Sequence, residues 1–348
     1  MKLPIEHILP GGPSLDEILA GIPRGRASEG LAKGCLVVEG GAFRGLHTQG
    51  FLDVMMENGL NLSCVIGVSA GALAGINYVA GQIGRSARTN IAFRHDSRYI
   101  GARSLLHSHS ILDVGFLTED RGVLEPLDRV RFDRPEQRFV AVATNCETGA
   151  ATYFEKGQCG DILLAARASA TMPFLSPVVM IDGAPYLDGG CSDAIPYRWA
   201  LDQRFEKIVV LRTRDKAFRD KGRLRRRADA LAESYIRRRL PGASRVYRAY
   251  PAFTERLSRR EASAVNRIYR RYPALAAVFM DSFRRYNEAC SELVQLHEAG
   301  RLLHICPSRP IEVGAIEGDV QKLYDLYCEG RRDALAWLPA LRQYLIGS

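Results

Sequence analysis

Ser69 stands at the centre of the pentapeptide Gly67-Val68-Ser69-Ala70-Gly71. An apolar, strand-like run precedes the pentapeptide and a helix-like stretch follows it, so the sequence predicts a strand, a sharp turn and a helix. In such a turn the serine is strained and its hydroxyl faces a substrate, while Gly67 and Gly71 let the two backbone arms pass closely. The pattern makes Ser69 a candidate nucleophile, although a glycine-flanked serine also arises by chance in turns that open helices.

A glycine-rich turn precedes this serine in the chain, and it reads Gly40-Gly41-Ala42-Phe43-Arg44-Gly45. Such a turn at the start of a helix directs several N–H groups at one point, which favours a phosphate or a developing oxyanion. A dinucleotide site would need three glycines in another spacing and an acidic residue about 20 residues later, and a P-loop would need Gly-Lys-Ser/Thr. The sequence has neither pattern. We therefore expect an oxyanion hole, with Arg44 and Gly45 as motif positions and with candidate donors at Gly40, Gly41, Ala42, Phe43 and Ala70.

A serine hydroxyl needs a base to take its proton. The chain has seven histidines, and none stands next to a motif of this kind. Asp188-Gly189-Gly190 follows an apolar run and offers a carboxylate held by tight glycine turns. An ordinary β-turn explains the same three residues. The arrangement that we favour is a pair in which Asp188 accepts the Ser69 proton directly.

These motifs, in this order, resemble those of the patatin-like phospholipases, whose serine and aspartate form a catalytic dyad without histidine. The resemblance covers roughly residues 34–213 and includes 167–173, which is similar to the segment that the family carries before its aspartate motif. Ala42 departs from the pattern, because the family more often has a third glycine there. Its N–H should still serve as a donor unless the position requires a positive φ. The resemblance implies a three-layer α/β fold and an acyl hydrolase that acts on lipids, without metal or cofactor.

The rest of the chain fits a parallel sheet flanked by helices, with the site beyond the carboxyl ends of the strands. We expect an irregular arm at 1–33, a catalytic domain at 34–213 and a basic, mainly helical region at 214–348. The strand candidates are 35–39, 64–68, 139–144, 151–154, 178–182 and 207–213. The helix candidates are 46–58, 71–80, 161–170, 273–300 and one or two helices in 320–345, with a further strand at 302–306.

Composition and cysteine spacing indicate the cellular compartment in which we expect the protein. The 348 residues are 47% hydrophobic, yet no segment has the roughly 18 uncharged apolar residues that a membrane span needs. No signal-peptide pattern stands at the beginning, and the eight cysteines include no Cys-x-x-Cys pair. We therefore expect a cytoplasmic protein with buried thiols, possible peripheral contact with the inner membrane face, and no disulfide or zinc site.

Positive charge is concentrated in the stretch from Arg212 to Arg285, which holds 22 Lys and Arg against 7 Asp and Glu, while the whole chain has a net charge of +9. Its arginine clusters alternate with aromatic residues. This pattern fits an anionic membrane surface, a nucleic-acid backbone or a solvated helical face. We expect the solvated face or the membrane in preference to nucleic acid.

Together these features predict a serine acyl hydrolase of the phospholipase A or esterase type. Ser69 attacks the ester carbonyl, Asp188 carries the proton, and the N–H groups of Gly41, Ala42 and Ala70 hold the oxyanion. Two alternatives stay open. The first is a non-catalytic module that binds polyanions or membranes and keeps the hydrolase fold. The second is an acyltransferase that uses the same dyad.

Overall fold

The strands of the main sheet follow the apolar runs of the sequence. The structure is a computed structural model that describes residues 13–97, 99, 125–173, 177–220, 271–314 and 317–347. In this part of the chain, five strands run parallel in the order β10 (Leu303–Ile305), β9 (Ile208–Leu211), β2 (Ala32–Val38), β3 (Leu62–Val68) and β5 (Arg138–Asn145). Three strands with antiparallel pairings complete the sheet. The strands β6 (Ala151–Glu155) and β8 (Ala184–Asp188) pair antiparallel with β5, and β7 (Val179–Ile181) pairs antiparallel with β8.

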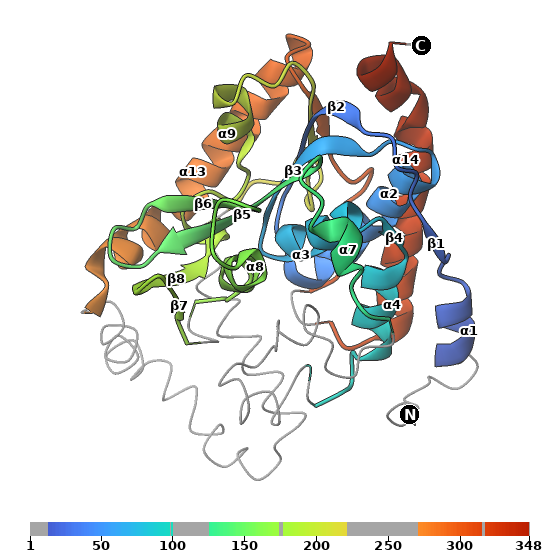
Figure 1. The fold of residues 1–348 in the computed structure, drawn as a ribbon, viewed down its shortest axis with the longest axis horizontal. Coiled ribbons are helices and arrows are strands. Elements are labelled where there is room, and N and C mark those ends of the chain that lie inside the picture. The colour runs from blue at the N-terminus through green and yellow to red at the C-terminus, as the bar shows by residue number, and fades with distance from the viewer. Residues whose placement is uncertain are drawn as a thin grey trace.

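Helices cover both faces of the sheet, which gives the three layers that were predicted (Figure 1). One face carries α2 (Gly45–Glu57), α3 (Ala70–Val79), α8 (Ile162–Ser169) and α14 (Val320–Ile346). The other carries α9 (Tyr197–Asp202) and α13 (Pro273–Glu298).

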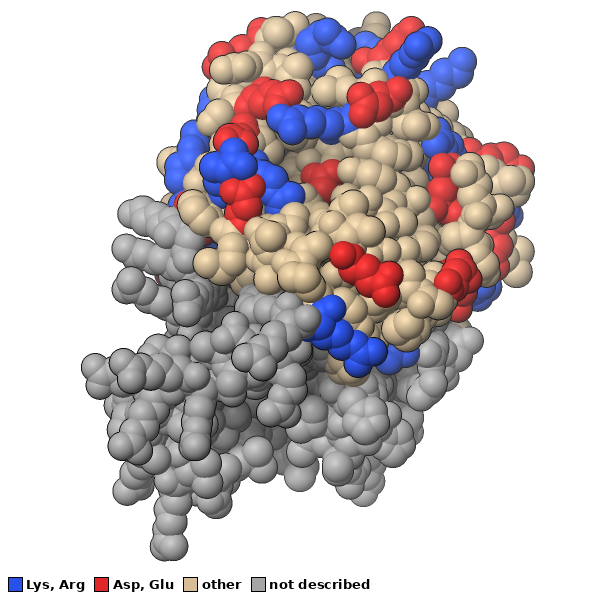
Figure 2. Space-filling model, turned by 90° about the vertical axis from the view of Figure 1, so that its left-hand side faces the viewer, with Lys and Arg blue, Asp and Glu red and all other residues tan. Residues whose placement is uncertain are grey.

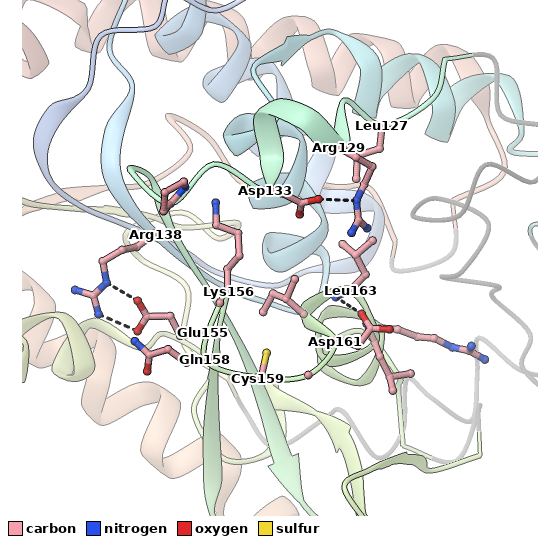
Figure 3. A pocket seen from close by; sticks show the side chains of 16 residues that line it. Leu127, Arg129, Asp133, Arg138, Glu155, Lys156, Gln158, Cys159, Asp161 and Leu163 are labelled. Atoms are coloured by element: carbon pink, nitrogen blue, oxygen red, sulfur yellow. Dashed lines mark hydrogen bonds and ion pairs between the residues drawn. The ribbon is translucent and has the colours of Figure 1, made fainter.

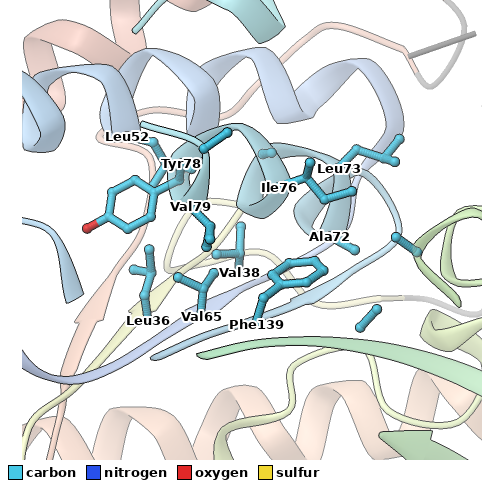
Figure 4. Close-up of a cluster of buried hydrophobic side chains, with 14 of the residues drawn as sticks. Leu36, Val38, Leu52, Val65, Ala72, Leu73, Ile76, Tyr78, Val79 and Phe139 are labelled. Carbon is cyan, nitrogen blue, oxygen red and sulfur yellow. The ribbon is translucent and has the colours of Figure 1, made fainter. Parts of the chain in front are cut away.

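Alternation along the strands explains the two covered faces. Successive side chains of a strand point to opposite faces, so both sets must be apolar when both faces are covered. Leu36, Val38 and Val65 pack under α2 and α3 (Figure 4). Cys35 and Val37, which alternate with them along β2, pack with residues of α9 and α13.

The helix α14 belongs to the same hydrophobic core as α2 and α3. It packs against α2 at two glycines: a Cβ on Gly50 would meet the Tyr327 carbonyl oxygen, and a Cβ on Gly330 would meet that of His47. The Tyr327 hydroxyl donates a hydrogen bond of 2.6 Å to the buried Asp53 carboxyl. The predicted helix or pair of helices in 320–345 is therefore one helix, and it is fixed to α2 by close backbone contact.

The expectation of an irregular arm at 1–33 needs correction for its described part. Residues 15–20 form the helix α1 (Leu15–Ala20), and the side chains of Ser14 and Glu17 cap it reciprocally. Such a capping box satisfies N–H groups that a helix start otherwise leaves unpaired. A short strand β1 (Gly25–Arg26) then pairs with β4 (Gln82–Ile83), which leads into α4 (Arg85–Ala92). The small helix α7 (Arg129–Phe132) precedes β5.

The strand β8 is not among the strand candidates of the sequence. The turn before it lies at Asp182 and Gly183, both of which have positive φ. Ala184 already begins β8 and pairs with Ile181 of β7. Asp188 is consequently the last residue of a strand that forms a hairpin with β7.

All eight cysteines are described and free, as expected, and five of them are buried. Cys35 and Cys64 are partners in the pairing of β2 with β3, and burial raises the pKa of the Cys35 thiol. Among the described helices, none is long and apolar enough to cross a membrane.

Candidate active site

Ser69 is the single residue between β3 and α3, and its backbone is strained. Its φ of 56° and ψ of −129° lie in a region that residues other than glycine rarely occupy. Such a conformation costs about 1–3 kcal/mol and persists only where the surroundings enforce it. Gly40 allows the close approach that does so, since a Cβ there would lie 2.8 Å from the Cβ of Ser69. The strand, turn and helix therefore have the form that the pentapeptide predicts.

The sheet register explains how Ser69 and Asp188 meet. One edge of β5 pairs with β3 as far as Val142, opposite Val68. From Ala143 onward the same edge pairs with β8, and Ala143 stands opposite Asp188. Because β8 runs antiparallel, its end meets the end of β3. Two residues that are 119 positions apart in sequence are thereby placed side by side at the carboxyl end of β3.

Asp188 is only 8% exposed. Its carboxylate accepts a hydrogen bond of 2.7 Å from the Gly190 N–H. Burial raises the pKa of Asp188 to about 6, and the nearby Ser69 hydroxyl and the Gly190 N–H oppose the rise because they favour the charged form. At neutral pH the group is therefore an ionised carboxylate that is more basic than an exposed aspartate.

The segment 167–173 supports both residues. The Ser69 N–H donates to the hydroxyl oxygen of Ser169 at 2.9 Å, and the Asp188 N–H donates to the Thr171 carbonyl at 2.9 Å. Ser169 is the last residue of α8 and is fully buried. The family resemblance includes this segment as a whole. The structure shows in addition that Ser169 contacts Ser69, whereas Thr171 contacts Asp188.

The glycine-rich turn lies beside the turn at Ser69. Gly41 precedes a short 3-10 helix, η1 (Ala42–Arg44), which leads directly into α2. A Cβ on Gly45 would lie 3.2 Å from the Cβ of Ala70. In the described part of the chain, the N–H groups of Gly41 and Ala70 have no protein acceptor. They are therefore available as oxyanion donors, and the donor roles of Gly40, Gly41, Ala42, Phe43 and Ala70 stay predictions.

Ala42 has the positive φ that the sequence analysis gave as the exception to its role as an oxyanion donor. Its φ is +49°, in the left-handed region where glycine is at ease and alanine is not. A left-handed conformation costs an L-residue about 1–2 kcal/mol. Any donor role of Ala42 therefore depends on a backbone that its own side chain disfavours.

Three of the described histidines have partners away from the site. His47 contacts the Asp333 carboxylate of α14 at 2.8 Å. His297 contacts the Leu302 carbonyl, and His304 contacts the Cys306 sulfur. His7, His107 and His109 lie outside the described residues. In the described part of the chain, no group of three His, Cys, Asp or Glu side chains is arranged to hold a metal ion.

A hollow of about 1060 Å³ opens at another place, around the amino-terminal ends of α8 and β5 (Figure 3). Four of its charged groups form ion pairs, Arg138 with Glu155 and Arg129 with Asp133. Ser69 lies at the opposite end of α8, where Ser169 accepts its N–H. We therefore assign this hollow no part in the chemistry.

The arginine clusters between residues 221 and 270 lie outside the described residues, so their proposed contact with an anionic membrane stays a prediction. Of the two named ends of the basic stretch, Arg212 is buried: it is 2% exposed and lies 3.7 Å from the Glu39 carboxylate. Arg285 is partly exposed, and it donates to the backbone carbonyls of Cys191 and Ser192. On the face shown in Figure 2, the described Lys and Arg side chains lie among Asp and Glu.

Two family models and several curated proteins are similar to parts of this chain. The sequence model of the family described as "Patatin-like phospholipase" matches residues 36–201, and one described as a domain of unknown function (DUF6363) matches 272–346. The uncharacterized protein YjjU of Escherichia coli K12 is 30% identical over 185 residues, 51% of either chain. The uncharacterized NTE family protein Rv1063c of Mycobacterium tuberculosis is 26% identical over 178 residues, which is 50% of this chain and 46% of the relative. The chain thus spans about half the length of these curated relatives.

A crystal structure of VipD from Legionella pneumophila aligns with 92% of this chain and 69% of its own, at 15% identity. Its TM-score of 0.40 is too low to carry an argument. The match of the family model and the fold described above carry the assignment instead: residues 36–201 are a domain of the patatin-like phospholipase family, a family of lipid hydrolases.

Proposed function

We propose that the protein is a serine acyl hydrolase that cleaves lipid esters with Ser69 and Asp188. The observation that carries the proposal is that the ends of β3 and β8 bring the strained Ser69 beside the buried Asp188 carboxyl, whose charged form the Ser69 hydroxyl favours. A nucleophile beside a base is the arrangement that hydroxyl activation requires. The catalytic unit would be residues 34–213, and the family relationship makes a lipid ester the substrate class.

The first half of the proposed reaction forms an acyl-enzyme. The Ser69 oxygen attacks the ester carbonyl carbon as its proton passes to Asp188, and the carbonyl oxygen becomes an oxyanion. The N–H groups of Gly41, Ala42 and Ala70 stabilise that charge, and one such donor is worth about 3 kcal/mol in comparable sites. When the tetrahedral intermediate collapses, the leaving alcohol takes the proton from Asp188.

The second half releases the acyl group. A water molecule attacks the acyl carbon while Asp188 takes its proton, and the collapse of the second intermediate returns the proton to the Ser69 oxygen. The products are a carboxylic acid and a regenerated enzyme. An acceptor alcohol in place of water would make the same dyad an acyltransferase.

The pKa of Asp188 suits a group that must first accept a proton and then release it. A general base works best when its pKa is close to the working pH. Burial brings the pKa of this carboxyl to about 6, so it is ionised at neutral pH and can still hold a proton between the two half-reactions.

Hydrolysis of a short nitrophenyl ester tests the proposal. The wild-type protein should release nitrophenol, and Ser69→Ala and Asp188→Asn should fall to background while remaining folded. Ser63→Ala is the matched control, because Ser63 is on β3, the strand that leads to Ser69, but its hydroxyl bonds to the Gly34 backbone. Full activity in a folded Ser69→Ala variant would refute the proposal.

A further inference from the structure

Two adjacent residues of α13 contact the two loops that form the site. Tyr286 bonds to Glu39, the residue before the glycine-rich turn, at 2.6 Å. Arg285 bonds to the carbonyls of Cys191 and Ser192, just after the Asp188 turn, at 2.7 and 3.0 Å. Both come from the stretch 272–346, which matches the domain of unknown function.

Tyr286 belongs to a buried network behind the glycine-rich turn. Its hydroxyl donates to one carboxylate oxygen of Glu39 and accepts a hydrogen bond of 2.7 Å from Arg212. The second carboxylate oxygen of Glu39 accepts the Thr213 N–H at 2.6 Å. The Thr213 hydroxyl in turn donates to the Gly40 carbonyl oxygen at 2.7 Å. The network thus ends on the peptide bond between Gly40 and Gly41.

That contact sets the direction of a proposed oxyanion donor. The peptide bond is planar and trans, so its C=O and N–H point in opposite directions. Holding the Gly40 carbonyl on Thr213 therefore aims the Gly41 N–H away from Thr213. A rotated peptide would lose the hydrogen bond to Thr213, and the Gly41 N–H would leave its position.

Arg285 acts on the other loop. Its guanidinium also bonds to the Val278 carbonyl of its own helix at 2.7 Å, which fixes the side chain in place. Cys191 ends the 3-10 turn η2 (Gly189–Cys191), and the N–H of Gly190 in this turn donates to the Asp188 carboxylate. By holding the end of the turn, Arg285 keeps the Gly190 N–H directed at Asp188.

Burying the charged groups of this network costs free energy that a purely structural contact would not require. Glu39 is 4% exposed and Arg212 is 2% exposed, and burying such ions costs several kcal/mol each before their attraction offsets it. Apolar residues of similar volume often stabilise a core as well or better. What the ions and the tyrosine add is a fixed geometry at Thr213 and Gly40.

We propose that Tyr286 and Arg285 are positioning residues, which hold the oxyanion turn and the Asp188 turn respectively, so that α13 is part of the catalytic centre. The inference depends on the proposed function, because it assigns the two residues to the same reaction. It gives the stretch 272–346 a specific task, namely to orient the groups that 36–201 supplies.

Tyr286→Phe tests the first half, with Tyr327→Phe as its matched control. Both changes remove a tyrosine hydroxyl that donates at 2.6 Å to a buried carboxylate, but Tyr327 contacts Asp53 and neither catalytic loop. For the ester substrate, Tyr286→Phe should lower kcat about tenfold or more with KM within about twofold, since a small displacement of a catalytic group has effects of this size. The control should keep the wild-type kcat. Equal kcat values in the two variants would overturn the inference for Tyr286.

Arg285→Gln tests the second half, with Arg284→Gln as its control. Arg284 is the neighbouring arginine, but its contacts are with Asp281 and Glu288 of the same helix. We expect Arg285→Gln to lower kcat about tenfold at nearly constant KM and Arg284→Gln to leave it unchanged. Unchanged kcat in Arg285→Gln would overturn this half of the inference.

Hydrogen–deuterium exchange gives a readout that does not require activity. Amides in 39–45 should exchange faster in Tyr286→Phe, and those in 189–193 faster in Arg285→Gln, while both control variants match the wild type. Unchanged exchange would show that the loops are not held in this way and would overturn the inference. An inactive wild-type protein would refute the proposed function and the catalytic meaning of the contacts, even if exchange showed that the contacts hold the loops.

Discussion

The backbone N–H of Ser69 donates a hydrogen bond to the side-chain oxygen of Ser169, although 100 residues separate the two serines. The bond joins the strained turn after β3 to the end of α8. Thr171, two residues further on, accepts the N–H of Asp188. One short segment therefore positions both members of the proposed dyad through contacts that do not involve the reacting atoms.

Ser169→Ala should destabilise the protein and slow hydrolysis. The change leaves the Ser69 N–H without its acceptor in a partly buried place, where the loss costs about 1 kcal/mol. It also removes one contact that enforces the unusual backbone angles of Ser69. Urea unfolding and ester hydrolysis should both report the loss. Unchanged kcat in this variant would show that other contacts hold the turn sufficiently.

The pH profile of kcat/KM should follow Asp188. Only the ionised carboxylate can accept the Ser69 proton, and burial raises the pKa of this group to about 6. The rate should therefore rise with pH through about 6 and level off above 7. An organic cosolvent should move the midpoint upward, because ionisation of a carboxyl creates charge whereas that of an imidazolium does not.

A midpoint that a cosolvent leaves in place or lowers would indicate a histidine base instead. The same conclusion would follow if a folded Gln variant of His47, His95, His107 or His109 were as inactive as Ser69→Ala.

Asp188→Asn should stabilise the fold at high pH while it abolishes hydrolysis. The pKa of the carboxyl is about 6 in the folded state and near 3.9 in an unfolded chain, so the folded state binds the proton more tightly. The stability that this proton provides is complete below pH 4 and is lost as the pH rises through 6. At pH 8 the substitution should therefore add about 1–3 kcal/mol to the free energy of unfolding.

Urea unfolding of the wild type and Asp188→Asn at pH 4.5 and pH 8 checks the sign. The gain should be much larger at pH 8. A loss of stability at both values would contradict the raised pKa.

Much of the site was visible in the sequence because its features are local. The turn at Ser69 needs only a strand, small residues and a helix start, and the apolar runs at β2 and β3 supply the strands. The hairpin strand β8 was missed because its Ala184-Pro185 start looks like a turn.

The remaining features depend on the tertiary fold. The end of β3 lies beside Asp188 because β5 pairs with β3 as far as Val142 and with β8 from Ala143 onward. No local sequence pattern predicts the residue at which this pairing changes. The contact of Tyr286 with Glu39 spans 247 residues, so no local pattern predicts it.

Ala42→Gly should stabilise the protein and keep its activity. Glycine adopts the φ of +49° without the cost of about 1–2 kcal/mol that alanine bears, although the unfolded chain gains entropy that offsets about 0.4–1 kcal/mol. The N–H donor stays. Thermal unfolding should show a small increase in Tm, and Ala42→Val should show a clear decrease because its branched Cβ fits a positive φ still less well. A lower Tm for Ala42→Gly would mean that the position is not strained.

Covalent labelling of the nucleophile tests the central claim most directly. The folded protein is treated with a fluorophosphonate, digested and mapped by mass spectrometry. Our account predicts a single adduct on Ser69, its absence in Ser69→Ala, and much slower labelling in Asp188→Asn. Folded wild-type protein that stays unlabelled, or that carries the adduct on another residue, would contradict the account.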